Sequence, residues 1–484
     1  MKKSIVIISA MLITVIVYLP QQASAQSPKK YSAQEVKDDL EYMYDMLEKC
    51  SYDLFALNSK ENMDKMYSSI YQSIDDSLTK IEIYKKYIPL VAATKMSHCM
   101  MNKPWGYYIN HYVNDGGTLF PLSIYFSGNK ALVNENYSAN SSINKHDEIL
   151  SINDKPINDF LQGFYKNMSG PTEYYINSII EKTGFTRLYW IFYGEKKSFR
   201  LKIKNSNGII SSQIVQAMPA REYEDIINAK AAEDKDERTF EFLNEHVALL
   251  NPGEFINYNS NKDLNSPEAF DNTEFCHFID SAFNSFKQKG IEHLIIDLRD
   301  NMGGDNSFSD YMIAYFADTS FSMASRMQMK TSQHTKDIWK DLAIPEIQEM
   351  KKQIMSLENG TRFDVDIQQY HPHPETKKFK GSVYVLVNRY SYSNAAMTAC
   401  IIQDYGFGKI IGEETADEVS SYGSIHRIDL PNTKFRVYYP KSFFVRPNGD
   451  PTPRGVVPDH IVYDDLLTDK DEVLEYTLKL IEGK

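Results

Sequence analysis

Cysteine and tryptophan are scarce in this chain of 484 residues, which has 4 Cys and 3 Trp. The cysteines are too few and too dispersed along the chain for a disulfide framework or a zinc site. Cys99 directly follows His98, which would suit a thiol nucleophile, but an isolated cysteine is more often a small buried residue. The cysteines therefore predict neither a disulfide-stabilised domain nor a metal site.

A positive charge excess is also missing, because the formal net charge is −12. This value argues against nucleic acid as the main partner. We find no internal repeat, no Pro- or Ser-rich linker and no low-complexity tract. With 42% hydrophobic residues the chain can bury a large core and should divide into two or three domains.

A long apolar run occurs near the N-terminus. Lys2 and Lys3 precede an apolar stretch over 5–19, which is followed by the small residues Ala23 and Ala25 in an A-x-A pattern. This pattern predicts a signal peptide, residues 1–25, with cleavage after Ala25. We therefore expect an exported protein, periplasmic or extracellular, with no stable membrane span after cleavage. An uncleaved membrane anchor is the alternative.

The segment VYVLVNRYSYSNAAMTACIIQD places a serine between a strand and a helix. Residues 383–388 form a short β-branched apolar run, and helix-forming residues begin at Asn394, with Gly406 as a stop. Ser393 then falls on the turn, where backbone N–H groups and the helix dipole stabilise a developing oxyanion. The alternative is that Ser393 simply caps the helix.

A second segment, HLIIDLRDNMGGDNSFSD, has the same order of strand and turn. Residues 294–298 predict a buried strand, and the turn from Asn301 to Gly304 has paired glycines that allow a close backbone approach. In α/β folds, ligands bind at the carboxyl edge of such strands. We expect the two loops to meet at one edge of a sheet, although two ordinary βα turns would also fit.

These segments resemble a known family. IIDLRDNMGG, and NRYSYSNAAMTACIIQDYG followed by IIGEET, are similar to the C-terminal processing (tail-specific) proteases, the tricorn core protease and the retinol-binding repeat proteins. Ser393 matches the nucleophile of that family. The resemblance implies an α/β (ClpP/crotonase-like) catalytic core acting on a peptide or protein substrate, and no metal or organic cofactor. The oxyanion donors would be the N–H of Asn394 and that of Gly303 or Gly304.

The family pattern also indicates the base. Tail-specific members use a lysine after the Gly-Glu-x-Thr motif, but Glu418 stands in that place here, and Lys409 comes before the motif. This departure argues against a Ser–Lys dyad. Tricorn-like members use a histidine upstream, and Ser97 and His98 occupy that position. An imidazole is a suitable base for a serine hydroxyl at neutral pH.

One member of the tricorn-like pattern is missing. Those proteins orient the histidine with a glutamate before a Gly-Val-x-Pro-Asp motif, which is present here as Gly455 to Asp459, but the preceding residues include no glutamate. Asp450 is the nearest acid and would be the substitute. Losing an orienting carboxylate can lower turnover by several powers of ten. A catalytically silent binder of peptides or apolar ligands is therefore the alternative function.

The periodicities divide the chain into three parts. Ser32 to Glu35 is a capping box, and helices predicted over 59–75 and 80–94 complete an N-terminal helical domain, residues 26–105. Residues 106–215 change to strands and turns and resemble a PDZ-like domain, with His146 where the family usually has glycine and closing strands over 190–203. The α/β core, residues 216–484, ends in a surface helix over 469–481. We therefore expect a mixed α/β multidomain fold.

Overall fold

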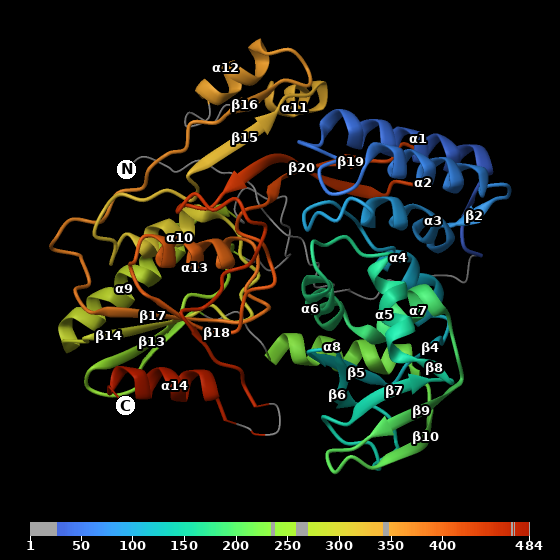
Figure 1. The fold of residues 1–484 in the computed structure, drawn as a ribbon, viewed down its shortest axis with the longest axis horizontal. Helices are drawn as coiled ribbons and strands as arrows, with labels where there is room; N and C mark the ends of the chain where they lie inside the picture. The colour runs from blue at the N-terminus through green and yellow to red at the C-terminus, as the bar shows by residue number, and fades with distance from the viewer. Residues whose placement is uncertain are drawn as a thin grey trace.

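The computed structural model describes residues 27–233, 238–257, 270–341, 348–465, 468 and 470–483. The predicted signal peptide lies outside these described residues. Within them, no helix is both long enough and apolar enough to cross a membrane. The chain forms two lobes that lie side by side, one built on a parallel sheet and the other on helices and an antiparallel sheet (Figure 1).

The N-terminal part is helical, as predicted. Ser32 caps the first helix through a capping box, in which Glu35 N donates to the serine hydroxyl at 3.3 Å and Ser32 N donates to the glutamate at 2.8 Å. The buried side of this helix carries Val36, Leu40 and Leu47. Its elements are β1 (Lys30–Tyr31), α1 (Ala33–Cys50), α2 (Lys60–Gln72), β2 (Leu78–Thr79), α3 (Lys80–Ala92) and β3 (Met100–Met101).

The middle part contains an antiparallel sheet of order β10-β9-β7-β6-β5. His146 adopts a positive φ of 69°, the conformation that glycine reaches most easily. The elements are α4 (Trp105–Tyr108), η1 (Ile109–Val113), β4 (Thr118–Leu119), β5 (Leu122–Ser127), β6 (Lys130–Asn136), β7 (Glu148–Ile152), β8 (Lys155–Pro156), α5 (Ile157–Tyr165), α6 (Glu173–Thr183), α7 (Phe185–Tyr193), β9 (Ser198–Lys204), β10 (Ile210–Gln216), β11 (Met218–Pro219) and α8 (Ala220–Glu233).

The prediction of closing strands over 190–203 is wrong in its first half. Trp190 lies in α7, and only the end of that range is a strand, β9. The segment FTRLYWIFY is rich in aromatic residues, which favours a strand locally, but Phe185, Leu188 and Tyr189 recur at helical spacing and are buried together. Tertiary packing thus overrides the local propensity.

The predicted boundary near residue 215 crosses a packed unit. Strand β11 pairs with β4, and α8 packs against β4 and η1. Residues 218–233 therefore pack with the middle part. The division into three domains stays a prediction in other respects.

The core is built on a six-stranded sheet of order β12-β13-β14-β17-β18-β21, in which the strands are parallel except for β12. Leu294 and Ile296 of β14 face one hydrophobic cluster and Ile295 faces the other, which explains why this strand is apolar throughout. Helices α9, α10 and α13 cover the first face and α14 covers the second (Figure 1).

The core elements lie between residues 239 and 481. They are β12 (Thr239–Phe242), β13 (Val247–Asn251), α9 (Thr273–Lys289), β14 (His293–Asp297), α10 (Asn306–Ile313), β15 (Arg326–Lys330), α11 (Gln333–Trp339), α12 (Gln348–Ser356), β16 (Arg362–Asp364), β17 (Ser382–Val387), α13 (Asn394–Asp404), β18 (Lys409–Gly412), β19 (Tyr422–Asp429), β20 (Arg436–Val445), β21 (His460–Ile461) and α14 (Glu472–Ile481).

A second sheet joins the lobes. Its order is β16-β15-β20-β19, and β3 from the N-terminal part pairs with β20 through Met100 and Met101. Ser97 and His98 come just before β3, so this pairing brings them next to the core. Strand pairing between residues more than 300 positions apart is the kind of contact that local periodicity does not predict.

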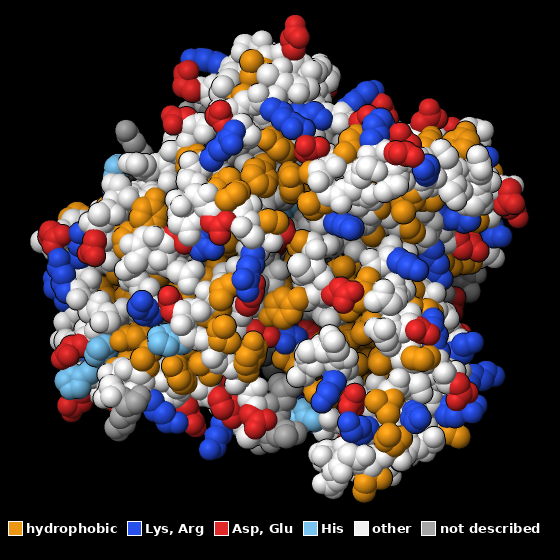
Figure 2. Space-filling view, viewed as in Figure 1, with side chains coloured by type: hydrophobic (Ala, Val, Ile, Leu, Met, Phe, Trp, Pro, Cys, Tyr) orange, Lys and Arg blue, Asp and Glu red, His pale blue; other side chains and the backbone are white. Residues whose placement is uncertain are grey.

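The face seen in Figure 2 carries acidic and basic side chains interspersed, and apolar side chains gather along the seam between the lobes. The negative net charge is therefore not concentrated in one patch on this face.

Candidate active site

Ser393 lies on the turn between β17 and α13, as predicted. Its backbone has φ 48° and ψ −121°, a conformation that non-glycine residues rarely adopt. Hydrogen bonds join this turn to the loop after β14. The Ser391 hydroxyl donates to the Leu298 carbonyl at 2.7 Å, and Tyr392 N donates to the Asn301 carbonyl at 3.0 Å. The two predicted loops therefore meet at one edge of the sheet.

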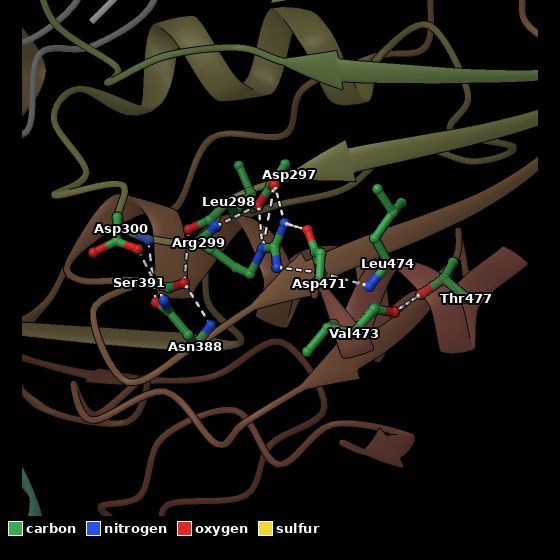
Figure 3. A network of polar contacts seen from close by, with 10 residues as sticks. All are labelled: Asp297, Leu298, Arg299, Asp300, Asn388, Ser391, Asp471, Val473, Leu474 and Thr477. Atoms are coloured by element: carbon green, nitrogen blue, oxygen red, sulfur yellow. Dashed lines mark hydrogen bonds and ion pairs between the residues drawn. The ribbon is translucent and has the colours of Figure 1, made fainter. Parts of the chain in front are cut away.

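The root of the loop after β14 is held by a charged network (Figure 3). Arg299 binds the carboxylates of Asp297 and Asp471, each at 2.7 Å, so that it ties β14 to the start of α14. Asp300 N donates to the Asn388 side chain at 3.1 Å. These bonds fix the LRDN motif against the residues that lead to the nucleophile.

The paired glycines approach the nucleophile turn closely. A Cβ atom on Gly303 would lie 2.7 Å from Asn394 N and 2.9 Å from the Cβ of Ser393, and Gly303 has φ +90°. The N–H of Gly303 donates to the Asn301 side chain at 2.8 Å. The N–H groups of Gly304 and Asn394 have no acceptor among the described residues. Two backbone donors thus remain at residues that directly follow Ser393 and Gly303 in the chain.

His98 is 3% exposed, and its Nδ1 lies 3.0 Å from the hydroxyl of Ser97. Its Nε2 has no hydrogen-bond partner within the described part of the chain. In the tautomer with the proton on Nδ1, the imidazole donates to Ser97 and leaves Nε2 as an acceptor. That is the state which a general base requires.

One tyrosine contacts both the histidine segment and the nucleophile segment. Tyr175 of α6 donates its hydroxyl to the Ser97 carbonyl at 3.5 Å, and its ring lies 6.2 Å from that of Tyr392, edge to face. Burial, and then charge interactions with Asp417, Tyr392 and Glu418, raise the pKa of Tyr175 well above its ordinary value. Through Tyr175, α6 thus contacts both the segment of the predicted base and the segment of the predicted nucleophile.

Helix α6 contacts the nucleophile side elsewhere too. The Tyr392 hydroxyl donates to Ser178 at 2.6 Å, and the Tyr390 hydroxyl donates to Glu181 at 2.7 Å. Tyr174 donates to the Glu414 carbonyl at 2.7 Å. This helix was predicted neither as an element nor as part of the site, because its contacts are far apart in sequence.

Two adjacent buried acids follow the Gly-Glu-x-Thr motif, and the first of them binds the nucleophile turn. Asp417 is 1% exposed, and its carboxylate accepts the Ser393 N–H at 2.7 Å. Glu418 occupies the place of the lysine in tail-specific proteases, and its Oε1 is buried without a hydrogen-bond partner among the described residues. Burial, and then the charge of Asp417, raises the pKa of Glu418 to about 8.

Asp450 lies in an exposed turn. Its carboxylate accepts hydrogen bonds from the backbone N–H and the hydroxyl of Thr452, at 2.9 Å and 2.6 Å. These bonds lower the pKa of Asp450. In this structure the carboxylate caps its own turn, and its role as an orienting acid stays a prediction.

The side chain of Asn394 is bound by residues of α10 and its N-cap. Its side-chain amide donates to the Asp305 carbonyl at 3.2 Å and to the Ser309 hydroxyl at 2.8 Å. Burial raises the pKa of Asp305, and it raises the pKa of Asp310 to about 7. The Asn394 side chain is thus fixed by α10 and its cap, which leaves the backbone N–H of Asn394 in a defined position.

The edge strand of the middle sheet, β5, is occupied by side chains of this chain. Phe126 N donates to Glu181, and the Phe126 carbonyl accepts from Arg389 at 2.7 Å. A peptide that added a strand here, as in PDZ recognition, would have to displace these groups.

Cys99, next to His98, is fully buried, and burial raises the pKa of its thiol to about 12. It is therefore a packed thiol, as the sequence favoured. The four cysteines are free, and the described ranges contain no group of three or more His, Cys, Asp or Glu residues placed to hold a metal ion.

Comparison with known proteins identifies the core domain. Residues 269–462 match the family described as Peptidase family S41. The fold is similar to that of mature CPAF complexed with lactacystin, at 15% identity over 93% of this chain and 99% of that one, with a TM-score of 0.64. A second structure of mature CPAF gives 15% identity, 93% and 98% coverage, and a TM-score of 0.61.

A third similar structure is a photosystem II D1 C-terminal processing protease, at 14% identity over 91% of this chain and 96% of that one, with a TM-score of 0.44. At such identities the two CPAF structures support the mixed α/β multidomain fold, while the family match concerns the region that holds Ser393 and the paired glycines. Residues 269–462 thus carry a peptidase family S41 domain, and this family match supports a serine-type peptidase.

Proposed function

We propose that this chain is an exported serine endopeptidase in which Ser393 is the nucleophile and His98 is the base. The proposal is carried by one observation, the position of Tyr175 between Ser97 and Tyr392, because it links the histidine and nucleophile segments through one side chain. Export rests on the signal-peptide pattern of the sequence alone.

In the proposed reaction, Nε2 of His98 takes the proton from the Ser393 hydroxyl as its oxygen attacks a peptide carbonyl. His98 then protonates the amine that leaves, and water releases the acyl group from the serine in a second step with the same base. Ser97 supports the base by accepting the Nδ1 proton, which keeps Nε2 available.

The oxyanion is assigned to the N–H groups of Asn394 and Gly304. Of the two glycines that the family resemblance offers, Gly303 already donates to Asn301. Gly303 instead provides space, since a side chain there would collide with Asn394 N. Loss of one donor in such a pocket lowers turnover by about 10² to 10³.

The middle domain is proposed to be PDZ-like, on the basis of its sheet order and the positive φ of His146. Peptide capture along β5 is not part of the proposal, because Glu181 and Arg389 already bind that edge. The substrate peptide would instead lie across the edge of the core sheet that holds Ser393.

A weak or silent family member that binds peptides or apolar ligands is the second candidate. The observation in its favour is that Asp450, the nearest substitute for the missing glutamate, caps its own turn. An unoriented imidazole is a weaker base in serine hydrolases. A silent binder would leave Ser393 unmodified by a fluorophosphonate.

The first test is hydrolysis of an unstructured protein such as casein by the purified mature chain and by Ser393→Ala and His98→Ala. Both variants should lose turnover by about 10³-fold or more, because removal of a triad member leaves only binding and oxyanion contributions. Circular dichroism should be unchanged in Ser393→Ala, since the serine lies on a half-buried turn.

The matched controls are Ser281→Ala and His277→Ala, which remove an exposed serine and an exposed histidine on α9. Both should hydrolyse casein at the wild-type rate. Turnover retained by Ser393→Ala would reject the proposed nucleophile, and turnover retained by His98→Ala would reject the proposed base.

A further inference from the structure

The backbone of Ser393 needs an external support. At φ 48° and ψ −121° it lies in a region that strains a residue with a Cβ. Such a conformation persists only where surrounding contacts enforce it. One of these contacts is the close approach of Gly303, and another is the hydrogen bond from Ser393 N to Asp417.

The buried position and the hydrogen bonds of Asp417 fix its carboxylate where it accepts this bond. Its side chain is buried, one carboxylate oxygen accepts Ser393 N at 2.7 Å, and the other accepts Glu418 N at 3.1 Å. The Thr415 hydroxyl donates to the Asp417 carbonyl at 3.3 Å and so fixes the backbone of the same residue. None of the ion pairs in the described part of the chain involves Asp417, so backbone N–H groups satisfy this carboxylate.

We infer that Asp417 is a positioning residue for the nucleophile: its buried carboxylate accepts the Ser393 N–H and holds the turn in the conformation that presents the serine. The inference rests on the proposed function of Ser393. It adds to that function a role for the segment after the Gly-Glu-x-Thr motif. This segment positions the nucleophile and does not transfer a proton.

The bond has a consequence for the oxyanion pocket. In many serine hydrolases the N–H of the nucleophile is itself an oxyanion donor. Here that N–H is bound to a carboxylate, so it is withdrawn from the pocket. The donors that remain are those of Asn394 and Gly304, and their placement depends on the turn that Asp417 holds.

Glu418 makes this arrangement sensitive to pH. Its carboxyl is protonated at neutral pH, because burial and the Asp417 charge raise its pKa to about 8. Within the described part of the chain, Tyr175 and Tyr422 also interact electrostatically with it, and both stay neutral because burial raises the pKa of each hydroxyl. Above about pH 8, two adjacent buried carboxylates would repel each other and disturb the bond to Ser393.

The experiment measures the rate of fluorophosphonate labelling of Ser393 in the full mature chain, together with kcat and KM on casein. Asp417→Ala should slow labelling about a hundredfold and lower kcat with little change in KM, because a misplaced nucleophile costs about that much. Asp417→Asn keeps an acceptor oxygen, so it should stay within about tenfold of wild type.

Glu418→Gln is the matched control. It copies the protonated acid, so labelling at pH 7 should equal that of wild type, and the decline above about pH 8 should disappear.

The experiment distinguishes failure of the inference about Asp417 from failure of the proposed function. If wild type is not labelled at Ser393, the proposed function fails. If wild type is labelled but Asp417→Ala is labelled equally fast, the inference about Asp417 is overturned while the function stands. Should the alanine variant not fold, a hundredfold loss in the folded Asp417→Asn variant would overturn the inference in the same way.

Discussion

Gly303 is the residue where close approach is most demanding. With φ +90° and backbone atoms of Tyr392 and Asn394 at 2.7 Å from the site of a Cβ, an added methyl group must move the nucleophile turn. We predict that Gly303→Ala lowers the fluorophosphonate labelling rate by about 10² or more, because the methyl group displaces the Asn394 N–H and loss of one oxyanion donor has about that effect.

Gly290→Ala is the control for this prediction. Gly290 has φ +71° and open space around the site of a Cβ, so its substitution strains the backbone without touching the site. It should cost about 1–3 kcal/mol of unfolding free energy and leave labelling unchanged. Equal labelling by the two variants would show that Gly303 has no special place in the pocket.

Asp450 gives a second prediction for a single residue. Because its carboxylate binds Thr452 in an exposed turn, Asp450→Asn should hydrolyse casein within about twofold of wild type. Steady-state kinetics decide the point. A fall of about 10⁴, as when an orienting acid of a serine triad is neutralised, would mean that the turn rearranges to bring Asp450 to His98.

At the scale of elements, Arg389 connects the nucleophile turn to the middle sheet. It pairs with Glu413 at 2.6 Å and Glu181 at 3.2 Å, and its side chain is 7% exposed. Arg389→Met leaves both carboxylates without their cation, and we predict a loss of about 3–5 kcal/mol in the free energy of unfolding, measured by urea denaturation.

The neighbouring pair Arg454–Glu414 is the control. It has a similar distance of 2.7 Å, but Arg454 is 58% exposed. Arg454→Met should therefore change the free energy of unfolding by about 0–1 kcal/mol. If the two variants lose the same free energy of unfolding, burial of the Arg389 ion pairs does not stabilise the contact between the lobes.

The sheet that joins the lobes contains a buried lysine that forms no ion pair with any residue the structure describes. Lys441 of β20 is 4% exposed and donates to the carbonyl and the hydroxyl of Ser424, and burial lowers its pKa to about 7. The folded state disfavours the charged form, so this lysine lowers stability increasingly as pH falls from about 10 towards 7.

Lys441→Met should therefore raise the melting temperature at pH 7. The gain should correspond to about 1–4 kcal/mol, as when other buried charged groups are replaced by apolar ones. Thermal unfolding followed by circular dichroism at pH 7 and pH 10 tests this, and the difference between the proteins should shrink at pH 10. A variant that is less stable at pH 7 would contradict the prediction.

Elements with strong local signals were predictable from the sequence. The capping box of α1, the apolar run of β17 and the stop at Gly406 each follow from contacts within one segment, and each is confirmed. Helix α7 was predicted wrongly, because its aromatic residues favour a strand until their packing is known. The local chemistry of a turn is thus more predictable than an element stabilised by distant partners.

At the scale of the whole molecule, the site is assembled from segments that are distant in sequence. The family resemblance supplied Ser393 and His98, but Tyr175 and Asp417 carry no motif and were missed. Their positions depend on α6 lying between the lobes and on the loop after β18 turning back to Ser393. A single sequence does not indicate which of its distant segments will be in contact.

Mapping of the fluorophosphonate adduct tests the central claim most directly. The mature protein would be labelled at neutral pH, digested, and analysed by mass spectrometry alongside His98→Ala and a heat-denatured sample. The account predicts one adduct, on Ser393, formed about 10³-fold more slowly in His98→Ala and absent after denaturation. An adduct on another serine, or labelling of Ser393 at the same rate without His98, would contradict it.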